Sequence, residues 1–220
     1  HVSFEVPRGE ILAVAGVQGN GQTELAEVIL GLRTPDSGTI RLEDADITRA
    51  KPRESLDAGV GFIPEDRSTD GIIASFSIAD NLVLDQFRSS SFSAAGSLKR
   101  GAIARNARDK EQEYDIRLTS IEDPVSSLSG GNQQKVVVAR EMSRDLTLLV
   151  ANQPTRGVDV GSIEFIHRRI VDVRDQGCAV LLISSELDEV VSLADRIAVM
   201  YRGRIVGIVP ADTGRDVLGL

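Results

Sequence analysis

A glycine-rich segment near the start of the chain carries the residue types that bind a phosphate group. It reads Gly16-Val17-Gln18-Gly19-Asn20-Gly21-Gln22-Thr23 and is followed by Glu24. Glycines let successive backbone N–H groups curl around an anion, and the N-terminus of a following helix adds its dipole. The spacing matches the phosphate-loop pattern of Gly, four residues, Gly, a basic residue and Ser or Thr. It predicts a nucleotide-binding loop, with Thr23 as the metal ligand and Gly16, Gln18, Gly19, Asn20, Gly21, Gln22, Thr23 and Glu24 as binding residues.

The basic residue of this pattern is absent, because Gln22 stands where a lysine is expected. Removing a charge-assisted hydrogen bond costs about 1.5–3 kcal/mol, and about 1.4 kcal/mol corresponds to a tenfold change in affinity. We therefore expect nucleotide binding to be weaker by roughly tenfold to a hundredfold, while the backbone cradle remains. Taken alone, the segment also fits a glycine turn that merely joins a strand to a helix.

A second pair of substitutions follows an apolar run, Leu146–Ala151, which ends in Asn152 and Gln153. In phosphate-loop ATPases the corresponding strand normally ends in an Asp that organises Mg²⁺ and a Glu that polarises the attacking water. The two amides keep the shape of these side chains and lose the charge, so they are poor Mg²⁺ ligands and cannot act as a general base. ATP and Mg²⁺ are the cofactors indicated, with poor Mg²⁺ binding expected in this chain. A strand that runs into an ordinary loop explains this piece equally well by itself.

The elements that position these motifs alternate between strand and helix. Glu10–Ala15 is an apolar run typical of a buried strand, and Glu24–Leu32 has the apolar spacing of a helix. Further strands are expected at Val2–Val6, Thr39–Thr48 (a strand or hairpin), Val60–Ile63, Leu146–Ala151, Ala179–Ser184, Ile197–Tyr201 and Arg204–Val209, and further helices between Ser77 and Asp115, from Ser129 and over Ile163–Val173. Ser89–Ser97 is expected to be a mobile loop, and Ser185–Asp188 has the form of a helix cap. This order predicts an α/β layered fold with a helical insertion.

Composition narrows the class of protein and of partner. Hydrophobic residues make up 41% of the chain and aromatic residues only 4%, which suits aliphatic parallel strands buried between helices. The net charge of −8 argues against nucleic acid as a partner. The single cysteine, Cys178, has apolar neighbours and is expected to be a buried structural thiol in a reducing compartment. His167 is expected to lie on the surface without a partner.

Two features of the sequence concern membrane insertion and secretion. No apolar run approaches the roughly 20 residues needed to span a bilayer. The first residues do not read as a signal peptide, and the abrupt start suggests a fragment cut from a longer protein.

The segment Leu128-Ser129-Gly130-Gly131-Asn132-Gln133-Gln134-Lys135 is the most specific motif of the chain. Ser129 can cap a helix, and the two glycines would expose the helix N-terminus to an anion. Paired glycines at a helix start cost stability, which favours a functional role over a purely structural cap. The segment closely resembles the signature of ABC ATPases, Leu-Ser-Gly-Gly-Gln/Asn.

The resemblance extends over nearly the whole chain. Pro154–Asp159 resembles the loop that crosses to a partner subunit. Gly61–Arg67 resembles the loop that links the core to a helical subdomain, with Glu65 where many relatives have Gln. Ile183–Leu187 resembles the switch region, with Ser185 where many relatives have His. These departures resemble the second, degenerate nucleotide-binding half of fused ATPases that serve ribose, xylose and nucleoside importers, with the nucleoside or lipoprotein-linked branch the more similar.

The resemblance implies a fold, a site and a set of partners. The fold would be a P-loop NTPase-like ABC domain with a small antiparallel β region, an ATP-binding core over 1–71 and 128–220, and a helical subdomain over 72–127 that contacts a membrane permease. Two such modules pair head to tail at the cytoplasmic face of the membrane, and an extracytoplasmic solute-binding protein takes part indirectly. The implied roles are Ser129, Gly130 and Gly131 acting catalytically in the partner's site, Gln153 and Ser185 as degenerate catalytic positions, and Glu65, Asn152 and Asp159 as further nucleotide-binding positions.

Other classes of protein remain open at this point. ABC ATPases of DNA maintenance or translation share the signature, but the short insertion and the acidic charge disfavour them. An adaptor half that has lost nucleotide binding is a further alternative, which the intact glycines disfavour. Asn152 and Gln153 are also substitutions that a biochemist would introduce, although the matching losses at Gln22 and Ser185 favour natural divergence.

Overall fold

The computed structural model describes residues 2–212. The chain forms two compact units. The first unit comprises residues up to 62, residues 145–154 and those from 167 onward, and the second comprises residues 63–144 and 155–166. The expected helical subdomain, 72–127, lies within the second unit.

The first unit is built on a six-stranded sheet with the strand order β10-β9-β1-β8-β7-β4. The strands are β1 (Ile11–Ala15), β4 (Val60–Ile63), β7 (Leu148–Asn152), β8 (Ala179–Ser184), β9 (Arg196–Tyr201) and β10 (Arg204–Pro210). β1 pairs in parallel with both β8 and β9, and β7 pairs in parallel with β8, whereas β10 is antiparallel to β9. β1 and β8 are buried along their whole length. Both faces are therefore covered, which explains why these strands are continuous apolar runs.

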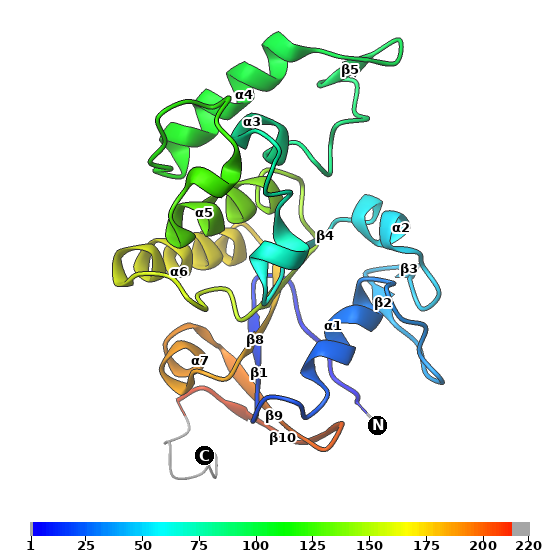
Figure 1. Ribbon diagram of the computed structural model, residues 1–220. Helices are drawn as coiled ribbons and strands as arrows, with labels where there is room; N and C mark the ends of the chain where they lie inside the picture. The colour runs from blue at the N-terminus through cyan, green and yellow to red at the C-terminus, as the bar shows by residue number, and fades with distance from the viewer. Residues whose placement is uncertain (1, 213–220) are drawn as a thin grey trace. The chain divides into compact units, whose positions relative to one another are not determined.

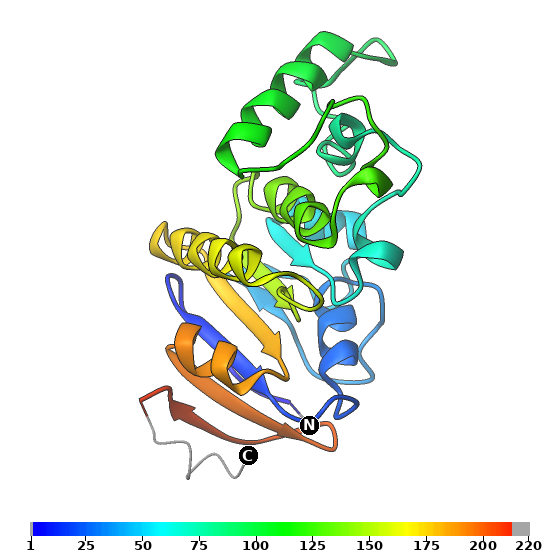
Figure 2. The same ribbon diagram turned by 60° about the vertical axis from the view of Figure 1, so that its left-hand side comes forward.

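Short helices surround this sheet (Figures 1 and 2). They are α1 (Gln22–Ile29), α2 (Pro52–Asp57), α7 (Leu187–Leu193) and the C-terminal part of α6 (Val160–Asp175). Ala26 and Ile29 of α1 pack into the same hydrophobic cluster as Leu12, Val14 and Leu181 of the sheet. This packing fixes α1 directly after β1, so the glycine-rich loop between them has a defined position. A two-residue pairing of β2 (Arg41–Leu42) with β3 (Ala45–Asp46) confirms the expected hairpin.

The second unit is mainly helical. Its elements are a π-helical turn (Arg67–Gly71), α3 (Ile78–Asn81), β5 (Ser93–Ala94), β6 (Ser97–Leu98), α4 (Arg100–Glu113), a 3₁₀ turn (Val125–Ser127), α5 (Gly130–Glu141) and the N-terminal part of α6. Val136–Ala139 of α5 are completely buried. α5 is therefore the central helix of the unit, and its N-terminus is the signature segment.

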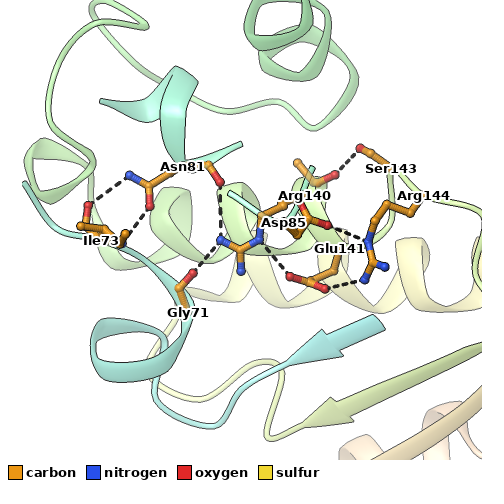
Figure 3. Close-up of polar contacts among 9 residues, drawn as sticks. Gly71, Ile73, Asn81, Asp85, Arg140, Glu141, Ser143 and Arg144 are labelled. Atoms are coloured by element: carbon orange, nitrogen blue, oxygen red, sulfur yellow. Dashed lines mark hydrogen bonds and ion pairs between the residues drawn. The ribbon is translucent and has the colours of Figure 1, made fainter. Parts of the chain in front are cut away.

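A buried ionic network joins the C-terminal end of α5 to the rest of the second unit (Figure 3). Arg140 donates to Glu141 at 2.9 Å and to the carbonyl of Gly71 at 2.8 Å. Arg144 contacts Asp85 at 2.7 Å and Glu141 at 3.1 Å. The side chains of these four charged residues are only 7–11% exposed. Burial, and secondly the charge of Glu141, raise the pKa of Asp85 above its usual range.

Two of the predicted local structures are wrong, because contacts with other segments determine the conformation there. Residues 2–6 are not a strand, and no described strand pairs with them. Phe4 and Val6 instead pack partly against the hydrophobic cluster of the sheet. The segment Ser89–Ser97 is not simply a loop, because β5 and β6 form a small antiparallel hairpin there.

Two predictions around α7 are also wrong. Ser185 does not cap the helix, since Glu186 is the N-cap residue and makes no side-chain capping bond. His167 is not a lone surface residue, because its Nε2 lies 2.9 Å from Oε1 of Glu189 and its side chain is only 21% exposed. Burial of Cys178 is confirmed, and desolvation raises the pKa of its thiol to about 11.

Candidate functional site

The glycine-rich loop joins β1 to α1 and has the backbone of a phosphate cradle. Gly19 and Gly21 have φ angles of 88° and 110°, in the left-handed region. A Cβ atom at Gly16 would lie 2.5 Å from the carbonyl oxygen of Met200, so glycine is required there by a close approach. The predicted turn between a buried strand and a helix is confirmed.

The side chain of Gln22 turns back into this loop. Its Oε1 accepts a hydrogen bond from the backbone N–H of Asn20 at 3.0 Å, and its Nε2 donates to the carbonyl of Val17 at 3.1 Å. Gln22 is only 7% exposed. A lysine ammonium could donate to the carbonyl but could not accept from the N–H. Phosphate oxygens accept hydrogen bonds from backbone N–H groups of such loops. The N–H of Asn20 already donates to a side chain of the same loop.

Asn20 ties the same loop to the turn between β9 and β10. Its Oδ1 accepts from the backbone N–H of Arg202 at 2.8 Å, and its carbonyl accepts from Gly203 at 2.8 Å. A pocket of about 870 Å³ lies beside these residues and is lined by Gly19, Gly21 and a largely apolar wall. Its lining includes Asn20 and Glu24 but not Gln22, Thr23 or Gln153, so it borders one side of the loop only.

The two strand-end amides lie at the carboxyl end of β7. Asn152 is its last residue and is 4% exposed. Gln153 follows with φ of 50°, and its Nε2 donates to Oγ of Ser185 at 3.1 Å. The two positions expected to be degenerate, Gln153 and Ser185, are therefore hydrogen-bonded to each other. Two neutral groups can orient a water molecule but cannot take its proton near neutral pH.

These residues fit a phosphate better than they fit Mg²⁺. Thr23 and Glu24 are exposed at the start of α1. Within residues 2–212, no group of three or more His, Cys, Asp or Glu side chains is placed to hold a metal ion. Thr23 offers a hydroxyl and Asn152 a neutral amide, and Mg²⁺ prefers carboxylates and phosphates. No reaction step through Mg²⁺ is assigned to this loop.

The signature segment lies in the second unit at the N-terminus of α5. Ser129 is the N-cap residue, and its Oγ accepts from the backbone N–H of Asn132 at 3.4 Å and from its Nδ2 at 3.0 Å. Oδ1 of Asn132 accepts from the backbone N–H of Arg117 at 2.8 Å. The prediction that Ser129 opens a helix is confirmed, and Asn132 fixes the orientation of its hydroxyl.

The two signature glycines are enclosed by neighbouring side chains. A Cβ atom at Gly130 would lie 2.5 Å from Nη2 of Arg67. A Cβ atom at Gly131 would lie 2.4 Å from Oδ2 of Asp159 and 2.4 Å from Oγ of Ser162. A side chain at Gly130 would therefore displace the end of Arg67, and one at Gly131 would displace Asp159 or Ser162.

The loop 155–159 contacts the signature through the same side chains. Arg67 donates from Nη1 to the carbonyl of Arg156 at 3.0 Å and from Nη2 to the carbonyl of Gly157 at 3.3 Å. Arg156 in turn pairs with Glu65. Asp159 accepts from the Oγ of Ser162 at 2.9 Å and from its backbone N–H at 3.0 Å, and these bonds lower the pKa of Asp159. Glu65 and Asp159 are thus brought together with the signature in one cluster.

Sequence reasoning did not assign three residues of this cluster, Arg67, Asn132 and Ser162. Arg67 and Asn132 lie within motifs that resemble family segments, but neither spacing nor residue type indicates what they contact. Arg67 reaches carbonyls 89 and 90 positions away in the sequence. Only the fold shows which loop Arg67 meets.

A family model described as ABC transporter matches residues 1–156. The chain belongs to the ABC transporter family. This cassette is 47% identical over 220 residues to the nucleoside import ATP-binding protein NupA of Lactococcus lactis subsp. cremoris, a match that covers 100% of the cassette and 44% of the relative. It is 46% identical over 220 residues to the guanosine import ATP-binding protein NupO of Bacillus subtilis, with 100% and 43% covered. It therefore spans less than half the length of these curated relatives.

A further relative and two solved structures extend the comparison. The ribose import ATP-binding protein RbsA 2 of Rubrobacter xylanophilus is 44% identical over 206 residues, which cover 94% of the cassette and 39% of the relative. The dimeric structure of MJ0796, a bacterial ABC transporter cassette, has a TM-score of 0.80 at 18% identity, with 97% of this cassette and 90% of that chain covered. A post-hydrolysis structure of MJ0796 bound to ADP and Pi has a TM-score of 0.81 at 18% identity, with the same coverage.

The structural likeness confirms the predicted fold class, an α/β ABC nucleotide-binding domain. At these identities it shows the fold alone. Within residues 2–212, none of the helices combines the length and the apolar character that a membrane span needs.

Proposed function

We propose that this cassette is the degenerate ATP-binding half of an ABC importer and donates its signature to the ATP site of a second cassette. The observation that carries the proposal is the contrast between the two sets of site residues. Gln22, Gln153 and Ser185 make neutral hydrogen bonds within the chain. Ser129 caps a preformed helix whose glycines are enclosed by charged side chains.

The transported solute is proposed to be a nucleoside or a sugar. The relatives at 47% and 46% identity are named for import of nucleosides and of guanosine, and one at 44% for import of ribose. The order of identities favours nucleosides. The proposed partners are membrane permease subunits contacted by 72–127, a second cassette paired head to tail at the cytoplasmic face of the membrane, and indirectly an extracytoplasmic solute-binding protein.

In this mechanism Ser129, Gly130 and Gly131 present the N-terminus of α5 to the terminal phosphate of ATP bound by the second cassette. Backbone N–H groups and a helix dipole stabilise the negative charge that develops there. The general base and the metal-binding carboxylate come from the second cassette. Glu65 pairs with Arg156 of the loop, and Asp159 lies beside Gly131 of the signature.

The phosphate loop of this cassette would bind ATP weakly and retain it. A phosphate that enters the cradle must displace the carboxamide of Gln22 from the N–H of Asn20. Gln153 and Ser185 then offer no group that takes a proton from water. An adaptor half that binds no nucleotide is the second candidate, and the internal hydrogen bonds of Gln22 are the observation that favours it.

The test is ATP-dependent uptake by proteoliposomes that contain the full-length protein with its permease, with guanosine and ribose as solutes. Ser129→Ala is expected to lower the uptake rate at least about tenfold, because it removes the cap that orients the signature. Gln22→Ala is expected to change the rate by less than about twofold, because this site does not turn over. The reverse ranking of the two variants contradicts the proposal.

A further inference from the structure

The guanidinium of Arg67 lies at a junction between two loops of the second unit. One side of it donates to the carbonyls of Arg156 and Gly157, at 3.0 and 3.3 Å. Its Nη2 also occupies the space beside Gly130, where a Cβ atom would come within 2.5 Å. Three contacts to two segments therefore depend on the position of a single side chain.

We propose that Arg67 is a positioning residue that makes the signature and the loop 155–159 move as one body, so that the signature meets the partner's ATP only when this loop is docked. The inference rests on the proposed function, because it assigns Arg67 a role in the site that the signature completes. Arg67 itself is not proposed to touch nucleotide.

The shape of the guanidinium suits this task. Arginine presents its donors in a rigid planar fork, so two carbonyls of consecutive residues can be held in one plane. Lysine has a compact ammonium on a flexible stem and cannot hold both carbonyls in fixed geometry. Its Nη2 also lies beside Gly130, and a larger residue at that position would displace it.

The backbone at Arg67 is itself held in place. Oδ1 of Asp66 accepts from the backbone N–H of Ser68 at 2.8 Å, and Oδ2 accepts from Oγ1 of Thr69 at 3.0 Å. The carbonyl of Arg67 accepts from the backbone N–H of Ile72 at 2.9 Å. The π-helical turn is therefore braced on both sides of Arg67, and its side chain starts from a fixed point.

A second contact also joins the segment 65–67 to the loop 155–159. Glu65 pairs with the side chain of Arg156, whose carbonyl is one of the two held by Arg67. The segment 65–67 thus holds the loop by its backbone through Arg67 and by a side chain through Glu65. Of these two side chains, only Arg67 also lies beside the signature, next to Gly130.

The experiment measures steady-state ATP hydrolysis by the full-length protein in its permease assembly. Arg67→Ala is expected to lower kcat about tenfold and to change KM for ATP by less than about twofold, because binding on the partner's phosphate loop is untouched. Arg67→Lys should recover only part of the loss. Arg53→Ala is the control, since Arg53 lies outside 72–127, is 53% exposed and pairs with Asp57 in the first unit.

A double-mutant cycle separates positioning from a general loss of folding. Gly130→Ala alone should displace the Arg67 guanidinium and lower kcat, because its Cβ takes the space of Nη2. Once Arg67→Ala has removed that guanidinium, Gly130→Ala should add less than about twofold. Additive losses in the double variant, or equal effects of Arg67→Ala and Arg53→Ala, overturn the inference.

Ser129→Ala is the reference that separates the two proposals. If Ser129→Ala lowers kcat and Arg67→Ala does not, the role of Arg67 is wrong and the signature proposal stands. If Ser129→Ala leaves kcat unchanged, the proposed function itself is wrong.

Discussion

The phosphate loop of the first unit and the signature of the second are both glycine-rich starts of a helix, yet their surroundings differ in charge. In the phosphate loop, Gln22 satisfies a backbone N–H and a carbonyl of its own segment. In the signature cluster, Arg67 lies beside Gly130 and Asp159 lies beside Gly131. A carboxamide carries both a donor and an acceptor, so it can close a loop on itself. A guanidinium only donates, and that of Arg67 reaches carbonyls 89 and 90 positions away in the sequence.

The largest effect is expected from a substitution in the signature. Gly131→Ala should lower ATP hydrolysis by the full-length assembly at least about a hundredfold, because its Cβ would lie 2.4 Å from Oδ2 of Asp159 and Oγ of Ser162. Gly207→Ala is the matched control, since no atom lies within 4 Å of its added Cβ. Similar activities of the two variants would show that the cluster has room for a side chain.

The next effect concerns the folding of the second unit. Arg144→Ala should lower the free energy of unfolding by about 3–5 kcal/mol, because it leaves Asp85 buried without its ion-pair partner and leaves Glu141 with Arg140 alone. Arg53→Ala should cost less than about 1 kcal/mol, since Arg53 and Asp57 are 53% and 59% exposed. Urea unfolding followed by circular dichroism compares them. A loss at Arg144 no larger than at Arg53 would mean that the network contributes little to folding.

A substitution that should raise the affinity for ATP tests the role of the phosphate loop. Gln22→Lys should raise the affinity for ATP roughly tenfold to a hundredfold, because it supplies a charge-assisted contact and removes an acceptor from the N–H of Asn20. Gln22→Ala is the control that removes the carboxamide without adding charge, and its affinity should be lower than that of Gln22→Lys. Isothermal titration calorimetry measures both. No gain in Gln22→Lys would mean that another group limits nucleotide binding.

The smallest effect depends on the thiol of Cys178, whose pKa burial raises to about 11 from an ordinary 9.0. A raised pKa means that the folded state holds the proton more tightly than the unfolded chain. The stabilising contribution is therefore fully present below pH 9 and is lost as the pH rises toward 11. Native protein should react slowly with a thiol reagent at pH 8 and rapidly in urea, and Cys178→Ser should show no reaction. Fast labelling of native protein contradicts burial.

The buried strands and the signature helix could be predicted from sequence because each is decided locally. Ala179–Ser184 is a continuous apolar run and forms β8 with the expected bounds. Ser129 before paired glycines indicates a capped helix, and α5 begins at Gly130. Residues 2–6 show the limit, because an alternating pattern becomes a strand only where another strand is available to pair with it.

Long-range polar contacts could not be predicted from the sequence. The loss of charge at Gln153 and Ser185 is visible in the residue types, but their mutual hydrogen bond spans 32 positions. The contacts of Arg67 span 89 and 90 positions and depend on how two loops pack. Spacing rules describe neighbours on one helix or strand, and they carry no information on which loops meet.

The most direct test of the asymmetric site counts the phosphate released in a single turnover. The full-length protein in its permease assembly is loaded with γ-labelled ATP, separated from free nucleotide and allowed to hydrolyse what it holds. The account predicts one labelled phosphate released per pair of cassettes, with the second ATP retained intact, because Gln153 and Ser185 cannot activate water. Release of two phosphates per pair would contradict it.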